Sequence, residues 1–302
     1  MKKFSVILTT YNSEKFIEKT LQSILNQDQL GSLFELELLV VDDCSTDETK
    51  NILNRLGVTA LSTPKNTGGP NAGRNIGLKN ASGDFICIAD HDDIWHSNRL
   101  VSIIPFVDKS EIITSGFTLK DTVSGQTINR VLESEKGYLI FEKNRTFLNK
   151  LSKTKGGQHT YLGCIFFSKN LLHNSFEEEF GVVDFDWVLR LFIDQPSLEV
   201  CDSLYTRFVD GPNLSLDPKY REIDYNFSLK TIKKYQSEFP EAVKIAEKRI
   251  NGSKARYHYL MGEMKKARHY LLKSEFSGKT ILYYLTSFIG HKWVRKKFNI
   301  FG

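Results

Sequence analysis

The first third of the chain alternates between short apolar runs and stretches in which apolar residues recur at helical spacing. The run Phe4–Leu8 predicts a strand, and Ile17, Leu21 and Ile24 predict a helix that follows a polar loop. The next predicted elements are strands over 36–41, 58–61 and 85–89 and helices over 46–56 and 71–81. This alternation of strands and helices favours an α/β fold with a mostly parallel sheet covered by helices.

Further along the chain the pattern is less regular. The predicted elements here are strands over 111–119, 161–167 and 198–209 and a helix over 184–193. Residues 120–160 show no clear periodicity, and beyond Pro218 only helical periodicity remains. Residues 255–271 resemble a helical hairpin that turns at Gly262.

The charge of the chain is divided between two regions. The 302 residues carry a formal net charge of +5. Residues 219–302 contain 19 Lys/Arg against 7 Asp/Glu, whereas residues 1–218 contain 22 against 29. We therefore expect two domains, a catalytic α/β domain over 1–218 and a basic helical region over 219–302 that attaches to something anionic. The overall excess of positive charge is too modest to indicate a nucleic-acid partner.

The composition and the cysteines indicate the setting. Hydrophobic residues make up 40% of the chain, as in globular proteins. Four scattered cysteines without a Cys-x-x-Cys pair predict neither a zinc site nor a disulfide framework, so we expect a reducing, cytoplasmic compartment. The chain shows no signal peptide, and its longest mostly apolar stretch, residues 281–289, is about half the ~20 residues of a membrane-spanning helix.

The end of the chain is amphipathic. Its apolar residues at helical spacing are Ile281, Leu285, Phe288 and Ile289. Lysines, an arginine and aromatic residues follow in the segment 291–298. We expect this tail to bind reversibly to an anionic membrane, on the inner face of the cell membrane. The alternative is that the apolar face packs on the catalytic domain.

An acidic cluster follows the predicted strand over 85–89. Asp90, Asp92 and Asp93 place three carboxylates on one short loop, with His91 among them. Hard divalent cations prefer carboxylate and phosphate oxygens, so the loop is a candidate metal–diphosphate site. It lies beyond the carboxyl end of a strand, where such sheets bind ligands. The alternative is a solvated acidic turn that caps the next helix.

Three more polar side chains are candidates for ligand contacts. Asp43 ends the second predicted strand, where it could accept a hydrogen bond from a base or ribose or cap a helix. Arg74 follows a glycine-rich stretch that lacks the Lys-Ser/Thr of a P-loop, and it could face a phosphate, pair with a carboxylate or lie on a helix surface. Asp184 opens a helix beside aromatic residues, which suits a general base, with an N-cap aspartate as the alternative.

Together and in this order, these motifs resemble the family 2 glycosyltransferases with the GT-A fold. The segments that carry the resemblance are Ser5–Asn12, Val40–Asp47, Ala72–Gly77, Ala81–Asp84 and Asp90–Asp93. The resemblance implies an enzyme that moves a sugar from a nucleotide-diphosphate donor to an acceptor hydroxyl with inversion at the anomeric carbon. It also implies a glycan or lipid-linked acceptor in bacterial surface polysaccharide or lipid-linked glycan synthesis.

The resemblance assigns roles to individual residues. The residues that match nucleoside-holding positions are Thr9, Tyr11, Asp43 and Arg74. Asp90 and Asp92 resemble the DxD motif, in which Asp92 is the ligand of Mn²⁺ or Mg²⁺ and Asp90 contacts the donor. Asp184 matches the catalytic base. Because Val183 replaces the glutamate that precedes this base in the family, Asp186 is the alternative base.

The segment that begins at Arg207 departs from the family, since it lacks the histidine that relatives carry before an Asn-x-Ser. Two other functions are weighed beside that of the glycosyltransferase. One is an inactive sugar-nucleotide-binding or scaffold protein on the same fold. The other is a nucleotidyltransferase, which would need a basic glycine-rich loop directly after the first strand. Residues 9–12 are not such a loop.

Overall fold

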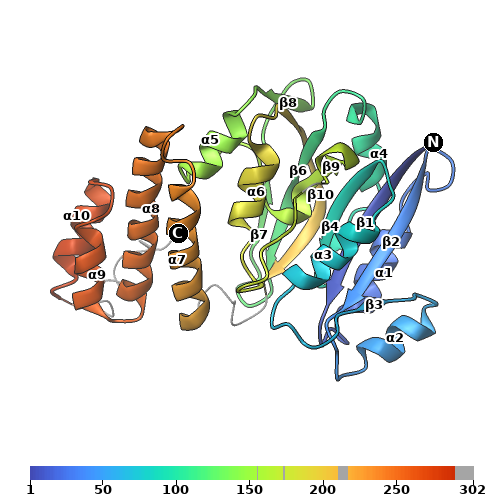
Figure 1. Ribbon diagram of the computed structural model, residues 1–302, viewed down its shortest axis with the longest axis horizontal. Coiled ribbons are helices and arrows are strands. Elements are labelled where there is room, and N and C mark those ends of the chain that lie inside the picture. The colour runs from blue at the N-terminus through green and yellow to red at the C-terminus, as the bar shows by residue number, and fades with distance from the viewer. Residues whose placement is uncertain (155, 173, 210–216, 290–302) are drawn as a thin grey trace. The chain divides into compact units, whose positions relative to one another are not determined.

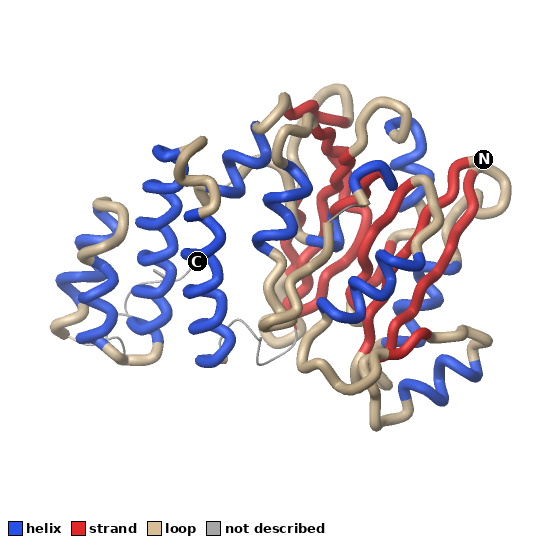
Figure 2. The backbone as a smooth tube through the Cα atoms, in the orientation of Figure 1, coloured by secondary structure: helices blue, strands red, loops and turns tan. Residues whose placement is uncertain are grey.

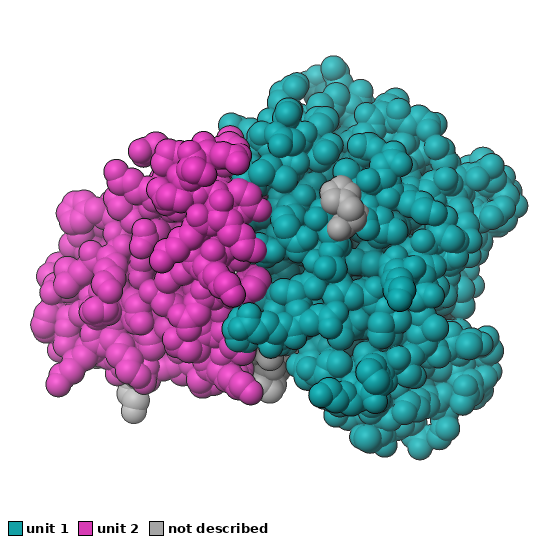
Figure 3. All heavy atoms as spheres, viewed as in Figure 1, with its two compact units in different colours: residues 1–147, 156–211 teal, residues 148–155, 212–302 magenta. Residues whose placement is uncertain are grey.

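The chain is divided into two compact units. The computed structural model describes residues 1–154, 156–172, 174–209 and 217–289. The first unit comprises residues 1–147 and 156–211, and the second comprises 148–155 and 212–302 (Figure 3). The segment 148–155 therefore joins the second unit, whereas the sequence alone predicts it in the first. Residues 210–216, just before the predicted boundary, and the basic segment 291–298 lie outside the described residues.

The first unit is built around one mixed sheet, drawn in red in Figure 2. Its strands are β1 (Lys2–Thr10), β2 (Phe34–Asp42), β3 (Leu61–Ser62), β4 (Phe85–Asp90), β5 (Ile94–Trp95), β6 (Ile112–Asp121), β7 (Thr127–Arg130), β8 (Tyr138–Phe141), β9 (Ile165–Ser168) and β10 (Ser197–Val209). The order is β3-β2-β1-β4-β9-β6-β10-β5, with β7 paired to β6 and β8 to β10. The strands from β3 to β4 are parallel, as are β6 and β10, whereas β9 runs antiparallel between the two groups.

Helices cover both faces of this sheet, as predicted (Figure 1). The helices of the first unit are α1 (Ile17–Leu25), α2 (Thr49–Arg55), α3 (Asn71–Asn80), α4 (Arg99–Ile103) and α6 (Phe185–Phe192), with 3-10 turns at Ile104–Phe106, Leu162–Cys164 and Lys169–Leu171. Helix α5 (Arg145–Leu151) begins in the first unit and continues into the second. Phe4, Val6 and Leu8 of β1 share a core cluster with α1. The alternate residues of β1 face α3, where an added Cβ at Gly77 would lie 2.3 Å from Ile7. Because successive side chains of β1 point to opposite faces and both faces are covered, every residue from Phe4 to Leu8 is buried, which explains the continuous apolar run in the sequence.

Two predicted strands differ from the observed ones. Only Leu61 and Ser62 pair with β2, although a strand is predicted over 58–61. Val58 and Ala60 instead pack against the core from a loop, so they are apolar without belonging to a ladder. Likewise, the first residues of the strand predicted over 161–167 form a 3-10 turn whose side chains are buried. In both places burial produced the apolar pattern without extended pairing.

The second unit is helical, as predicted. Its helices after residue 217 are α7 (Pro218–Lys233), α8 (Pro240–Leu260), α9 (Met264–Leu271) and α10 (Gly278–Thr286). The predicted hairpin is confirmed, because α8 and α9 are joined at Gly262, whose φ of +79° suits glycine. Ala255 and Tyr259 of α8 pack with Ala267, Leu271 and Tyr283 in a small core.

The apolar residues near the end of the chain are exposed. Helix α10 packs through Tyr283 and Thr286, whereas Leu285 and Phe288 are 60% and 66% exposed. Among the residues that the structure describes, no helix combines the length and hydrophobicity needed to span a bilayer.

Candidate active site

The carboxyl ends of β2, β1 and β4 bring the predicted polar residues to one edge of the sheet. In the strand register Thr9 lies opposite Val41 on one side and opposite Asp90 on the other. Thr10 lies opposite Asp42, so the loops that begin after β1 and β2 start side by side. Thr9 and Thr10, which the sequence predicts as loop, belong to the strand because both pair with β2. The edge therefore collects Thr9, Asp43 and Asp90 as expected for a parallel sheet.

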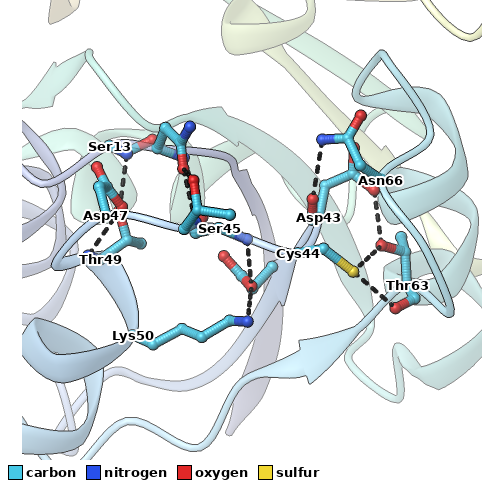
Figure 4. Close-up of polar contacts among 12 residues, drawn as sticks. Ser13, Asp43, Cys44, Ser45, Asp47, Thr49, Lys50, Thr63 and Asn66 are labelled. Atoms are coloured by element: carbon cyan, nitrogen blue, oxygen red, sulfur yellow. Dashed lines mark hydrogen bonds and ion pairs between the residues drawn. The ribbon is translucent and has the colours of Figure 1, made fainter.

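The loop after β2 is held by its own polar side chains (Figure 4). The carboxylate of Asp43 accepts a hydrogen bond from the Thr63 hydroxyl at 2.6 Å and from the Thr67 N–H at 3.0 Å. Asp43 therefore fastens the loop of residues 63–67 instead of capping a helix. Helix α2 begins at Thr49, whose N–H donates to Asp47 at 3.0 Å.

Tyr11 lies on the neighbouring loop, which is tied to the loop after β2. The Asn12 side chain accepts from the Thr46 N–H at 2.8 Å, and the Asn12 N–H donates to Ser45 Oγ at 2.9 Å. The ring of Tyr11 remains 45% exposed beside these contacts. An exposed aromatic ring on a fixed loop offers a surface on which a nucleobase can stack.

Helix α3 places Arg74 under the same edge. An added Cβ at Gly73 would lie 2.9 Å from Thr9 Cγ2, so glycine there allows α3 to approach β1 closely. Arg74 is buried and donates to Asp90 at 3.2 Å and to Asn71 at 3.1 Å. Its guanidinium lies 5.5 Å from the centre of the Phe176 ring. Arg74 is thus paired with a carboxylate, and the alternative of a surface arginine is wrong.

The acidic loop after β4 concentrates negative charge. Burial raises the pKa of Asp92, and Asp90 adds to the rise while His91 opposes it. Asp93 is only 3% exposed, and burial together with the charges of Asp90 and Asp92 raises its pKa to about 8. The alternative of a solvated turn that caps the next helix is wrong, because Asp93 is buried and α4 begins after Asn98.

Two arginines that the sequence analysis did not single out accompany this loop. Burial lowers the pKa of Arg207 on β10, but the charges of Asp93 and Asp90, with Tyr205 and Tyr161, outweigh burial and raise it. Arg99 is fully buried, with its guanidinium between the rings of Trp95, Phe166 and Tyr205 at 4.4 to 4.8 Å. In the sequence, Arg207 was notable only for its place near the end of a predicted strand and at the start of the segment that lacks the family's histidine.

Asp184 lies at the N-cap position of α6, but its side chain makes no capping hydrogen bond. Its carboxylate has no hydrogen-bond partner among the described residues. Asp186, by contrast, is buried and accepts from Arg190 Nε at 2.9 Å. Of the two candidate bases, Asp184 is therefore the one whose carboxylate is available to a substrate.

The loop before Asp184 is bound to the start of α3. The Asn71 side chain donates to the Val183 carbonyl at 2.9 Å and to the Glu177 carbonyl at 3.0 Å, and its N–H donates to the Gly181 carbonyl at 3.1 Å. An added Cβ at Gly69 would lie 2.3 Å from the same Gly181 carbonyl oxygen. The helix that carries Arg74 and the loop before Asp184 are thus held together, although Asn71 and Val183 are 112 residues apart in the sequence.

The donor set of the acidic loop fits a divalent cation in its chemistry. The carboxylates of the loop supply the hard oxygen ligands that Mg²⁺ or Mn²⁺ prefers, and burial, together with repulsion from neighbouring carboxylates, raises the pKa values of Asp92 and Asp93. Within the described ranges, no three acidic, histidine or cysteine side chains are grouped so that they could hold a metal alone. A cation here would therefore take further ligands from a diphosphate or from water.

Comparison with known proteins agrees with this geometry. The sequence model described as glycosyl transferase family 2 matches residues 5–176. The poly(ribitol-phosphate) beta-N-acetylglucosaminyltransferase TarS of Staphylococcus aureus is 35% identical over 177 residues, which are 57% of this chain and 30% of TarS. The minor teichoic acid biosynthesis protein GgaA of Bacillus subtilis is 31% identical over 182 residues, 56% of this chain and 38% of GgaA. The chain thus spans less than half the length of these relatives.

The fold agrees with a solved structure. The crystal structure of S. aureus TarS 1–349 in complex with UDP-GlcNAc has a TM-score of 0.59 and 21% identity to this chain. The similarity covers 97% of this chain and 92% of that one. The predicted GT-A architecture with a helical region after it is confirmed at the level of the fold.

Proposed function

Because the chain belongs to glycosyl transferase family 2, we propose that it transfers a sugar from a nucleotide-diphosphate sugar to an acceptor hydroxyl with inversion at the anomeric carbon. The observation that carries the proposal is that one unit contains both the acidic loop 90–93, in which Asp93 is buried, and the available carboxylate of Asp184. Displacement of a nucleoside diphosphate needs both a neutralised leaving group and a base for the acceptor proton.

The donor is proposed to bind along the carboxyl edge of β2, β1 and β4. Tyr11 offers its exposed ring to the base, and Thr9 and Asp43 lie beside it at the strand ends. The Asp43 carboxylate accepts from the Thr63 hydroxyl and from the N–H and the hydroxyl of Thr67, so about one of its roughly four acceptor positions is left for a ligand. Arg74 acts through Asp90, whose carboxylate it holds toward the donor side. Since relatives include the UDP-GlcNAc-bound TarS, a uridine nucleotide is the first donor to test.

The cofactor is proposed to be Mn²⁺ or Mg²⁺, with Asp92 as its ligand. When bound, such a cation supplies positive charge to the diphosphate that leaves. Arg207 supports this site from β10, since its charge interacts with Asp93 and Asp90. The segment that begins at Arg207 lacks the histidine that relatives carry. The guanidinium of Arg207 is proposed to supply a permanent positive charge to the diphosphate in its place.

Asp184 is proposed as the general base. A base must lie within hydrogen-bond reach of the acceptor hydroxyl and have no competing internal donor. The carboxylate of Asp184 meets the second condition within the described residues, whereas Asp186 is paired with Arg190. The contacts of Asn71 with the Asp184 loop hold the base in a fixed position relative to α3.

The acceptor is proposed to be a bacterial surface glycan or a lipid-linked glycan that carries phosphate. TarS is named for poly(ribitol-phosphate), and a Campylobacter jejuni relative with 29% identity is named for an undecaprenol diphosphate-linked glycan. The proposed location that goes with such an acceptor is the cytoplasm, at the inner face of the cell membrane. The exposed Leu285 of α10, Phe288 after this helix and the basic segment 291–298 are proposed to bind that surface.

A panel of nucleotide sugars tests the proposed activity. The full chain is incubated with each sugar and Mn²⁺, and release of the nucleoside diphosphate is measured with and without a phosphate-bearing glycan acceptor. We expect one donor to be hydrolysed slowly and consumed faster when the acceptor is present. Tight binding of a nucleotide sugar without any turnover would instead support the inactive binding or scaffold protein.

A further inference from the structure

The second compact unit contains a pocket of its own, apart from the acidic edge of the sheet. Its volume is about 510 Å³, and its walls come from residues 153–154, from α8 and from the segment 271–283. Five cationic side chains line it, namely Lys153, Lys248, Arg249, Arg256 and Lys279. Glu275 is the one carboxylate among the described residues of its lining.

Three of these five cations are not neutralised by any residue that the structure describes. Arg249 pairs with Glu275 at 3.5 Å and donates to the Ser152 carbonyl at 2.9 Å. Lys248, Arg256 and Lys279 form no hydrogen bond or ion pair with any other residue in the described part of the chain. The pocket therefore holds a surplus of positive charge that water and mobile anions must balance.

The surroundings of Arg256 point the same way. Burial lowers the pKa of Arg256, and the positive charge of Arg221 lowers it further, whereas Tyr283 has the opposite effect. Arg221 itself has a buried Nε without a hydrogen-bond partner. Arg221 is outside the lining of this pocket, but its charge acts on Arg256, and neither guanidinium has a carboxylate partner among the described residues. An anion bound beside Arg256 would offset this repulsion.

Neutral donors in the pocket suit phosphate oxygens. Ser253 of α8 and Ser277 and Thr280 of α10 line it with hydroxyl groups. Ser277 caps α10 by accepting from the Thr280 N–H at 3.2 Å, so the positive end of the α10 dipole lies at the pocket. Gly252 leaves room next to Arg256, whose Nη1 lies 3.5 Å from the position of an added Cβ.

We propose that this pocket binds the phosphate groups of the acceptor. The inference rests on the proposed function, in which the acceptor carries phosphate and the donor diphosphate is bound at the acidic loop. A single inorganic phosphate would leave most of 510 Å³ empty, whereas pockets of ~300–1,000 Å³ enclose ligands of several rings or repeats. The cations would bind the phosphate, while the hydroxyls would contact the sugar or polyol that bears it.

The phosphate can come from a phosphodiester-linked chain or from the diphosphate of a lipid-linked sugar, and two soluble probes separate these sources. The first is a synthetic ribitol-phosphate oligomer and the second a short-chain prenyl diphosphate sugar. A neutral oligosaccharide serves as the negative control. Binding to the full chain is measured by calorimetry at low and high salt. We expect one phosphate probe to bind, more weakly at high salt, and the neutral sugar not to bind.

Matched double variants locate the binding. Lys248→Gln with Lys279→Gln removes two exposed cations of the pocket, and neither has an internal partner to lose. Lys244→Gln with Lys273→Gln makes the same charge change at exposed lysines outside the pocket. We expect the pocket variant to weaken binding of the phosphate probe about tenfold or more, and the control to leave it unchanged.

Release of nucleoside diphosphate from the donor without acceptor reports the proposed function separately, and both variants should retain it. Equal affinities of the pocket variant and the control variant would overturn the inference. So would a wild-type chain that hydrolyses donor but binds neither phosphate probe. A chain that binds a phosphate probe through the pocket but hydrolyses no donor would overturn the activity and leave the anion site standing.

Discussion

Carboxylates at the two ends of the parallel strands have pKa values that are shifted in opposite directions. At the amino end, Glu37 of β2 accepts hydrogen bonds from Lys3 Nζ and the Ser82 N–H at 2.9 and 2.8 Å. Although burial alone would raise the pKa of Glu37, hydrogen bonds from Ser5, Ser82 and Lys3 lower it to about 2. At the carboxyl end, burial and mutual repulsion raise the pKa of Asp93 to about 8.

The difference separates a structural carboxylate from a binding site. Glu37 is satisfied by donors of its own chain, so it stabilises the fold and has no need of a ligand. The acids of the loop 90–93 repel one another, and the divalent cation that we propose would relieve this repulsion. The following predictions break or sharpen this contrast, from the largest expected effect to the smallest.

Removal of the divalent cation should abolish activity. In excess EDTA transfer should stop, and Mn²⁺ or Mg²⁺ should restore it. Asp92→Ala should weaken binding of the nucleoside diphosphate in the presence of metal and have little effect in its absence, because the lost interaction runs through the cation. Calorimetry with and without Mn²⁺ measures this difference. Full transfer activity in excess EDTA would contradict the metal site.

Asp184→Asn should lower kcat by about 10²–10⁴-fold, the usual contribution of a general base, while binding of the donor is retained. Steady-state kinetics and donor calorimetry separate the two effects. Asp186→Asn is the matched control, since it breaks the contact with Arg190 and should reduce stability more than kcat. Near-wild-type turnover of the Asp184 variant, with a large loss in the Asp186 variant, would mean that Asp186 and not Asp184 is the general base.

Arg207→Gln should weaken binding of the nucleoside diphosphate about tenfold, because it removes one charge that faces the acidic loop and the phosphates. Arg207→Lys should recover part of the loss, since it keeps the charge but not the planar donor fork. Arg130→Gln, at an exposed arginine on β7, makes the same charge change and should leave the affinity unchanged. Equal affinities for all three variants would exclude Arg207 from the donor site.

Glu37→Gln should lower the free energy of unfolding by about 1–3 kcal/mol without a change in activity. Its pKa is about 2 in the folded protein and 4.5 for the unperturbed group. The stabilisation is therefore complete above the higher value and is lost as the pH falls toward the lower one. Urea unfolding across this range should show a steeper acid loss for the wild type than for the variant. Identical pH dependence would mean that Glu37 does not supply the stabilisation.

The sequence predicted the first unit well where the apolar pattern arises from the strand or helix itself. The alternation of β1 and the spacing of α1 identified both elements, and the ordered motifs led to the family and to the GT-A fold. The prediction failed where apolar residues are buried without pairing, as at Val58 and Ala60. Local patterns report burial, and only long-range contacts decide whether a buried segment joins a ladder.

The site was predicted less completely than the fold. Asp90, Asp92 and Asp184 stand in recognisable motifs, and the structure places them at strand or helix ends. Arg207 and the burial of Asp93 depend on β10 lying near the acidic loop, a relation that no local pattern contains. In the second unit the sequence showed only an excess of positive charge, whereas the pocket is formed by residues 153–154, α8 and the segment 271–283 together.

The contact between Asn71 and the loop 177–183 sets a rule for exchanging parts between enzymes of this kind. Asn71 binds the loop through the carbonyls of Glu177 and Val183, and the Glu177 side chain accepts from Asn71 and from the N–H groups of Phe180 and Val183. The amide at position 71, the bare backbone at Gly69 and the side chain at position 177 must therefore fit one another in whatever loop is installed. A chimaera that receives the loop 177–183 of another enzyme without the matching residues at positions 69 and 71 would lose the position of Asp184 before it gained a new acceptor specificity. The unit that must be exchanged is therefore discontinuous, and it comprises residues 69–71 and the loop 177–183, which are far apart in the sequence.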